Sequence, residues 1–76
     1  MVTPRPASLR FDTERLLIDM ALRGWEQKDL AAASGLSVMT ISRFVRGERQ
    51  TVKAAARIAS GLGYSVRRYL VTRRAA

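Results

Sequence analysis

The sequence contains no cysteine and no histidine among its 76 residues. Without cysteine the chain cannot form a disulfide or a thiolate metal site, and without histidine it lacks the commonest metal ligand and proton shuttle. Clustered carboxylates and a nucleophile paired with a base are also missing. We therefore expect no catalytic residue, no metal, no cofactor and no small-molecule substrate, and we expect a protein of the reducing cytoplasm.

Acidic residues and long apolar runs are scarce as well. Six Asp and Glu stand against 14 Lys and Arg, and the formal net charge of +8 favours a polyanionic partner, either nucleic acid or a membrane surface. No apolar run approaches the roughly 20 residues of a membrane span. The N-terminal stretch contains both prolines and no apolar block, so we expect no signal peptide. Since 47% of the residues are hydrophobic, we expect a folded basic domain.

Five glycines divide the chain into short segments, and within each segment the apolar residues recur with helical spacing. Residues that favour helix starts stand at Asp12 or Thr13, at Ser37 and at Thr51. In the first helix the inward stripe is expected to consist of Leu16, Leu17, Met20 and Ala21. The predicted helices cover about 12–23, 26–34, 37–46 and 51–62, and a fifth short turn covers 65–70.

No window alternates apolar and polar residues over a useful length, so we expect no strand. The predicted fold class is all-α, a compact bundle of four to five short helices in one domain over residues 12–70. The flanking segments have no packing pattern and are interpreted as flexible basic arms, 1–11 at the N-terminus and 71–76 at the C-terminus. Their arginines are Arg5, Arg10, Arg73 and Arg74.

The most informative segment runs from Gln27 to Gly47. Two helices that cross steeply through a short turn need a small residue at their close approach and a residue of positive φ in the turn. Ala31 and Gly35 meet these needs. The outer face of the helix at about 37–46 is then free to enter the major groove of DNA. The expected core beneath the corner consists of Leu30, Leu36, Ile41 and Phe44.

The order of residues in this segment resembles the helix-turn-helix of the phage Cro and CI repressors and of the XRE-like bacterial regulators that share it. The similarity extends from about Asp12 through Leu70. It implies a lambda repressor-like fold and sequence-specific binding of double-stranded DNA by a small transcriptional regulator. The residues that carry the pattern are Gln27, Leu30, Ala31, Gly35, Ser37, Thr40, Ile41, Ser42, Arg43, Phe44, Arg46 and Gly47.

The resemblance also implies roles for individual side chains. Gln27 and Ser37 would approach backbone phosphates. Arg46 and Arg49 flank the end of the recognition helix and are expected to contact phosphate rather than base. The side chains that would face the base edges are Val38, Met39, Ser42 and Arg43. The predicted DNA interface also includes Thr40.

The sequence departs from the family pattern in two ways. Ser34 stands where an apolar residue usually precedes the turn glycine, and Met20 and Val45 replace an ion pair that often joins the first and third helices. An apolar pair can replace a buried ion pair because neither charge must then be desolvated. Trp25 is interpreted as a core residue, and the acidic residues as helix caps and surface pairs. The arginines interpreted as solvated are Arg57, Arg67 and Arg68.

Several functions remain open at this point. The leading hypothesis is an operator-binding regulator of the Cro type. The second is an antitoxin or a phage recombination accessory protein, which would use the same fold to bind a protein partner as well as DNA. The third is a basic peptide that coats membranes or nucleic acid without specificity. An enzyme is the least favoured, because the residues for catalysis are missing.

A single helix-turn-helix covers few base pairs, so we expect a homodimer on DNA. The usual place for that contact in the family is the fifth helix and tail, here Val66, Tyr69 and Leu70. Ile18 and Leu22 form a second apolar pair on the first helix, which is either covered by the chain's own Leu9, Phe11 or 69–71 segment or binds a protein partner.

Overall fold

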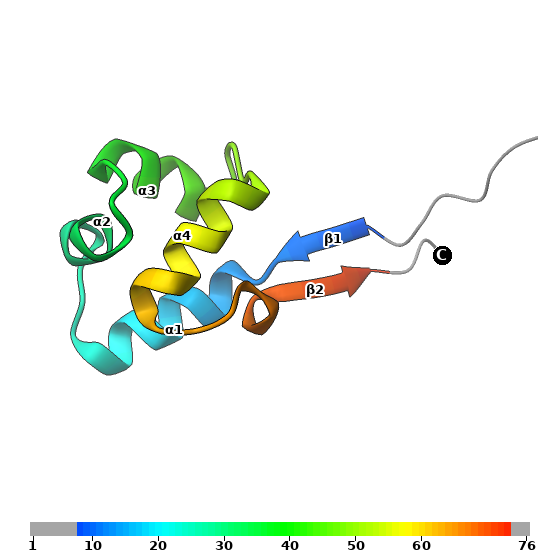
Figure 1. Ribbon diagram of the computed structural model, residues 1–76, viewed down its shortest axis with the longest axis horizontal. Helices are drawn as coiled ribbons and strands as arrows, with labels where there is room; N and C mark the ends of the chain where they lie inside the picture. The colour runs from blue at the N-terminus through cyan, green and yellow to red at the C-terminus, as the bar shows by residue number, and fades with distance from the viewer. Residues whose placement is uncertain (1–7, 74–76) are drawn as a thin grey trace, which may run out of the picture.

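Four helices form the body of the protein, and a two-stranded β-ribbon extends from it (Figure 1). This computed structural model describes residues 8–73, with side chains from 10 to 71. None of the helices in this range is long and apolar enough to cross a lipid bilayer. The helices are α1 (Thr13–Arg23), α2 (Gln27–Ser34), α3 (Val38–Val45), α4 (Val52–Leu62) and the short 3-10 helix η1 (Val66–Arg68). The strands of the β-ribbon are β1 (Ser8–Phe11) and β2 (Leu70–Arg73).

The helices begin where local capping chemistry favours a start. The side-chain oxygens of Asp12, Ser37 and Thr51 each accept a hydrogen bond from the backbone amide three residues on, at 3.0–3.1 Å. At the start of α2 the carboxylate of Asp29 accepts a hydrogen bond from the amide of Glu26 at 2.8 Å. Each such cap contributes about 1 kcal/mol of stability. The predicted starts of the helices are confirmed.

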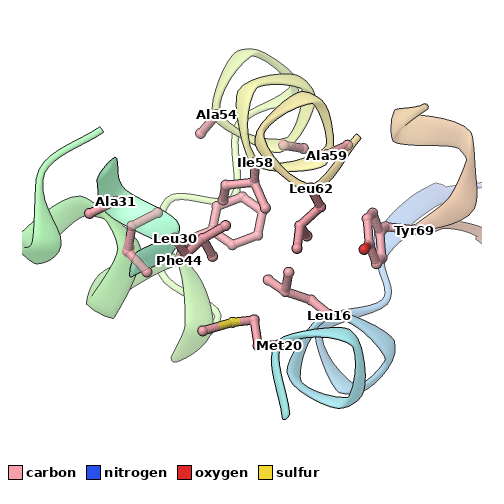
Figure 2. Close-up of a cluster of buried hydrophobic side chains, with 12 residues drawn as sticks. Leu16, Met20, Leu30, Ala31, Phe44, Ala54, Ile58, Ala59, Leu62 and Tyr69 are labelled. Carbon is pink, nitrogen blue, oxygen red and sulfur yellow. The ribbon is translucent and has the colours of Figure 1, made fainter. Parts of the chain in front are cut away.

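The core lies between the helices, with α4 supplying mostly short side chains and the other helices larger ones (Figure 2). Short side chains let α4 approach α2 closely. At Gly61 the approach is so close that an added Cβ would lie 2.9 Å from the carbonyl carbon of Ala33. The buried hydrophobic residues are Leu16, Met20, Leu30, Ala31, Ile41, Phe44, Ala54, Ala55, Ile58, Ala59, Leu62 and Tyr69.

The inward stripe of α1 differs from the prediction. Leu16 and Met20 are buried as expected, but Leu17 and Ala21 are exposed, and the third buried residue of the helix is Asp19. Positions 16, 19 and 20 share one helical face because a helix repeats every 3.6 residues. The prediction chose the neighbouring apolar residues, since a carboxylate is rarely buried without a partner.

Asp19 is buried because two residues far along the chain satisfy its carboxylate. The Arg68 guanidinium donates to both oxygens, with Nε at 2.9 Å and Nη2 at 3.0 Å, and the Tyr69 hydroxyl donates to Oδ2. The hydrogen bond from Arg68 outweighs desolvation and lowers the pKa of Asp19 from 3.8 to about 2. Arg68 is exposed, as expected of a solvated arginine, but it also pairs with Asp19. The interpretation of Asp19 as a cap or surface pair is wrong, because its side chain is buried. The network holds η1 against α1.

The prediction that the chain contains no strand is also wrong. β1 and β2 pair in antiparallel fashion, with Arg10 opposite Val71 and Phe11 opposite Leu70. Each strand has only four residues, too few to show a clear alternation. The ends interpreted as free arms are thus paired where the structure describes them, and the all-α helix-turn-helix class holds for the bundle itself. Two of the predicted arm arginines lie outside the described residues, namely Arg5 and Arg74.

Aromatic stacking joins the β-ribbon to the bundle. The Phe11 ring meets Phe44 edge-on, with centroids 4.6 Å apart, and stacks on Tyr69 at 5.2 Å. The amide of Asp12 also donates a backbone hydrogen bond to the carbonyl of Tyr69. Because Phe44 belongs to α3, these contacts fix the start of the ribbon relative to that helix.

Candidate nucleic-acid interface

The turn between α2 and α3 has the geometry that the sequence predicted. Gly35 ends α2 with a φ of 74°, a left-handed conformation that favours glycine. The hydroxyl of Ser34 donates to the carbonyl of Ala31 at 3.3 Å and accepts from the amide of Leu36 at 3.4 Å. The hydroxyl of Ser34 is therefore hydrogen-bonded within the turn. A polar residue in place of the usual apolar one thus leaves no unpaired polar group at this corner.

α3 has one buried face and one exposed face. Ile41 and Phe44 are fully buried, while Val38 is 49% exposed and Met39 is 63% exposed. The predicted interface residues that are exposed on α3 or at its ends are Ser37, Val38, Met39, Thr40, Arg43, Arg46 and Arg49, whereas Ser42 and Gln27 are half-buried.

Basic side chains gather on either side of Thr40. On one side Thr40, Arg43 and Arg49 line a depression of about 190 Å³. On the other side Thr40 shares a second depression, of about 320 Å³, with Lys53 and Arg57 of α4. The structure thus brings three of the predicted site residues together beside α3. Gln27 and Arg46 line neither depression.

The arginines around α3 differ in their ion pairs and in their backbone conformation. Arg46 pairs with Glu48 at 3.1 Å, and both side chains are largely exposed, so the pair contributes about 0–1 kcal/mol and opens readily. Arg43 makes no ion pair with any residue that the structure describes. Arg49 has a φ of 48°, which costs a residue with a Cβ about 1–2 kcal/mol. A phosphate or a base edge can therefore bind the guanidinium groups of Arg43 and Arg46 at little cost in free energy. Among the described residues Arg43 has no ion pair to break, and the ion pair of Arg46 is weak.

Comparison with known proteins relates this geometry to a family. A helix-turn-helix family model matches residues 18–68. The chain belongs to the Cro/CI-type helix-turn-helix family. No curated protein and no solved structure matches the chain. Because this is a family of DNA-binding regulators, the protein is a DNA-binding regulator of that type.

Two basic residues of this helix-turn-helix were missing from the predicted interface. The sequence predicted no role for Lys53 and a solvated position for Arg57. Both are exposed on α4 and border the same depression as Thr40, and Arg57 reaches the turn, with Nη1 3.9 Å from where a Cβ on Gly35 would stand. The helical spacing of Lys53 and Arg57 was visible in the sequence, but only the tertiary structure, in which α4 packs chiefly on α2, brings them beside Thr40 of α3.

Two expectations about protein contacts of the helix-turn-helix also change. Tyr69 is fully buried in its own core, so it is not free for a dimer contact. Ile18 and Leu22 are 53% and 81% exposed, and among residues 10–71 no segment of the chain covers them. The interpretation in which the chain's own tail shields this pair is therefore wrong for the residues that the structure describes.

Proposed function

We propose that the protein is a sequence-specific transcriptional regulator of the Cro type, which acts in the cytoplasm at the nucleoid. It places α3 in the major groove of an operator and excludes other proteins from that DNA. The observation that carries this proposal is the exposed outer face of α3 above a buried inner face. The major groove admits an α-helix and displays a distinct pattern of donors and acceptors for each base pair. We assign no catalytic step to the protein.

The side chains on α3 suit particular base edges. Arg43 is exposed and free of ion pairs among the described residues, so it can donate two hydrogen bonds to guanine O6 and N7. Val38 and Met39 can cover a thymine methyl group. We place Ser42 with them at the base edges, and we assign the remaining predicted side chains to the DNA backbone, namely Gln27, Ser37, Thr40, Arg46 and Arg49.

Selection of bound sequences from random duplex DNA tests this function. The wild-type protein should select a defined motif that contains guanine, and Arg43→Ala should lose the preference at one position, where a bidentate contact contributes about 1–3 kcal/mol. Arg46→Ala should weaken binding to all sequences alike. Arg67→Ala is a matched control, because Arg67 is exposed on η1 and borders neither depression. An unchanged base preference in Arg43→Ala would refute the assignment, and binding to any polyanion without preference would favour a coating peptide.

We further propose that the protein binds DNA as a homodimer. Among the residues that the structure describes, β2 pairs only with β1, so its outer edge presents backbone groups that a second copy can pair with. A two-fold dimer reads two half-sites about one turn of DNA apart. Sedimentation with the selected duplex should give two chains on a site with inverted symmetry. A complex of one chain on an asymmetric site at all concentrations would exclude the dimer.

The second candidate function is that of an antitoxin or recombination accessory protein with a protein partner. The exposure of Ile18 and Leu22 favours it. In Figure 1 α1 and α3 lie on opposite sides of α4, so a partner on α1 leaves α3 free for DNA. Coexpression with the product of a neighbouring gene should give a complex that the double variant Ile18→Ser, Leu22→Ser loses and that Val52→Ser, an equally exposed apolar control, retains. A complex that survives in the double variant would exclude this surface.

A further inference from the structure

A groove of about 490 Å³ lies between the β-ribbon and the end of α3. Arg10 and Val71, which are paired across the two strands, line one side. Arg46 and Gly47, which follow α3, line the other. The family match covers residues 18–68, so the β1 wall of this groove lies outside the helix-turn-helix motif. Its function does not follow from the motif.

Both walls of the groove are held in place by contacts with α3. Phe11 packs on Phe44, which fixes β1 beside the helix. The side-chain amide of Gln50 donates to the hydroxyl of Thr13 and to the carbonyl of Phe44, both at 2.8 Å, and so ties the start of α1 to the end of α3. Arg10 stands next to Phe11 in the strand and is exposed. Its backbone is therefore ordered before any ligand binds, which lowers the entropic cost of a contact.

We propose that this groove seats the DNA backbone that borders the recognition helix, with Arg10 as a phosphate contact. The proposal rests on the proposed function, because it assumes that α3 occupies the major groove. In Figure 1 β1 is the strand of the ribbon on the side of α3. Arg46 is the C-cap of α3, so the groove begins where that helix ends. A strand of DNA that leaves α3 on this side meets two arginines, one on each wall.

The acidic residues of the groove set where a phosphate can sit. Asp12 already caps α1 and lies 3.8 Å from Arg15. Glu14 is exposed and also lines the groove. A phosphate must therefore lie closer to Arg10 and Arg46 than to Glu14. Removing the charge of Glu14 should strengthen binding if DNA occupies the groove, and should leave DNA binding unchanged if a protein segment does.

The test is the salt dependence of binding of the full chain to its selected duplex. Loss of one phosphate contact lowers the slope of log K against log salt by about 0.9. Between about 50 and 200 mM salt, the advantage of wild type over Arg10→Ala should therefore shrink about 3.5-fold. Arg67→Ala, an exposed arginine that does not line the groove, should keep the wild-type slope. Glu14→Gln should bind more tightly than wild type.

The outcomes separate this proposal from the proposed function. If wild type selects no duplex sequence, the proposed function fails and the placement of Arg10 fails with it. If wild type binds its duplex and Arg10→Ala keeps both its slope and its wild-type melting temperature, only the placement is overturned. Equal affinities of Glu14→Gln and wild type would also count against DNA in the groove. A reduced slope in Arg10→Ala with an unchanged melting temperature supports it.

Discussion

Replacing Gly61 by alanine should destabilise the protein, although alanine is the better helix former. Gly61 lies in α4 against the backbone of α2, and a Cβ at this position would stand 2.9 Å from both the carbonyl carbon and the carbonyl oxygen of Ala33. Non-bonded carbon atoms are most stable about 3.5–4.0 Å apart. The variant must therefore separate the two helices or bend one of them.

Two opposing effects decide the sign of the change. Removing a glycine from a helix interior stabilises by up to about 1 kcal/mol, whereas forcing an extra carbon into a packed contact costs about 1–3 kcal/mol. The atoms in the way belong to backbone, which cannot rotate aside as the end of a side chain can. We therefore expect a net loss of about 1–2 kcal/mol, which lowers the melting temperature of a domain of this size by at least about 4 °C.

Thermal and urea unfolding, followed by circular dichroism, measure this loss. Ala56→Gly is the matched control, because Ala56 is exposed on the same helix and reports helix propensity alone. It should cost about 1 kcal/mol. If Gly61→Ala were more stable than wild type by a similar amount, α4 would not approach α2 as closely as described, and the reasoning would be refuted.

Two further predictions concern Asp19 and Arg49. Because the pKa of Asp19 is lowered from 3.8 to about 2 in the folded state, its ionised form stabilises the fold above pH 3.8, and this contribution is lost as the pH falls toward 2. Urea unfolding at a series of pH values should show Asp19→Asn less stable than wild type at neutral pH and less sensitive to acid, and parallel curves for the two proteins would contradict the network. Arg49→Gly should raise stability by up to about 1 kcal/mol, because glycine adopts a positive φ without steric cost, and should weaken binding to all duplexes; a lower melting temperature would argue against backbone strain.

Much of the bundle could be predicted because its signals are local. The caps at Ser37 and Thr51 act over three residues, and the spacing of Ile41 and Phe44 defines the buried face of α3 within one turn. The turn at Gly35 likewise needs only its own φ. These features lie within the helix-turn-helix, so the exposed face of the recognition helix was also predictable, including Val38, Met39, Thr40 and Arg43.

Most of the errors involve residues whose partners lie far along the chain. Asp19 sits on the inner face of α1, and only a guanidinium 49 residues later makes its burial tolerable. Neither segment of the β-ribbon has a strand signal of its own, because each is stabilised by pairing with the other and by the stacking of Phe11. Similarly, the aromatic ring of Tyr69 was expected to be available for a dimer contact, but it is fully buried in the core of its own chain.

The amino-acid sequence by itself determined the number and ends of the main helices, the turn and the family, because caps, helical spacing and turn glycines act within a few residues. Only the tertiary structure decided which charges are buried, which apolar residues stay exposed and what lies beside the recognition helix. Arg10 illustrates the difference, because the residues around it in the sequence are equally compatible with a flexible arm and with a strand. Pairing with β2 and packing of Phe11 on α3 place it across a groove from Arg46. Such contacts join residues that are distant along the chain, and they exist only once the core that holds them has formed.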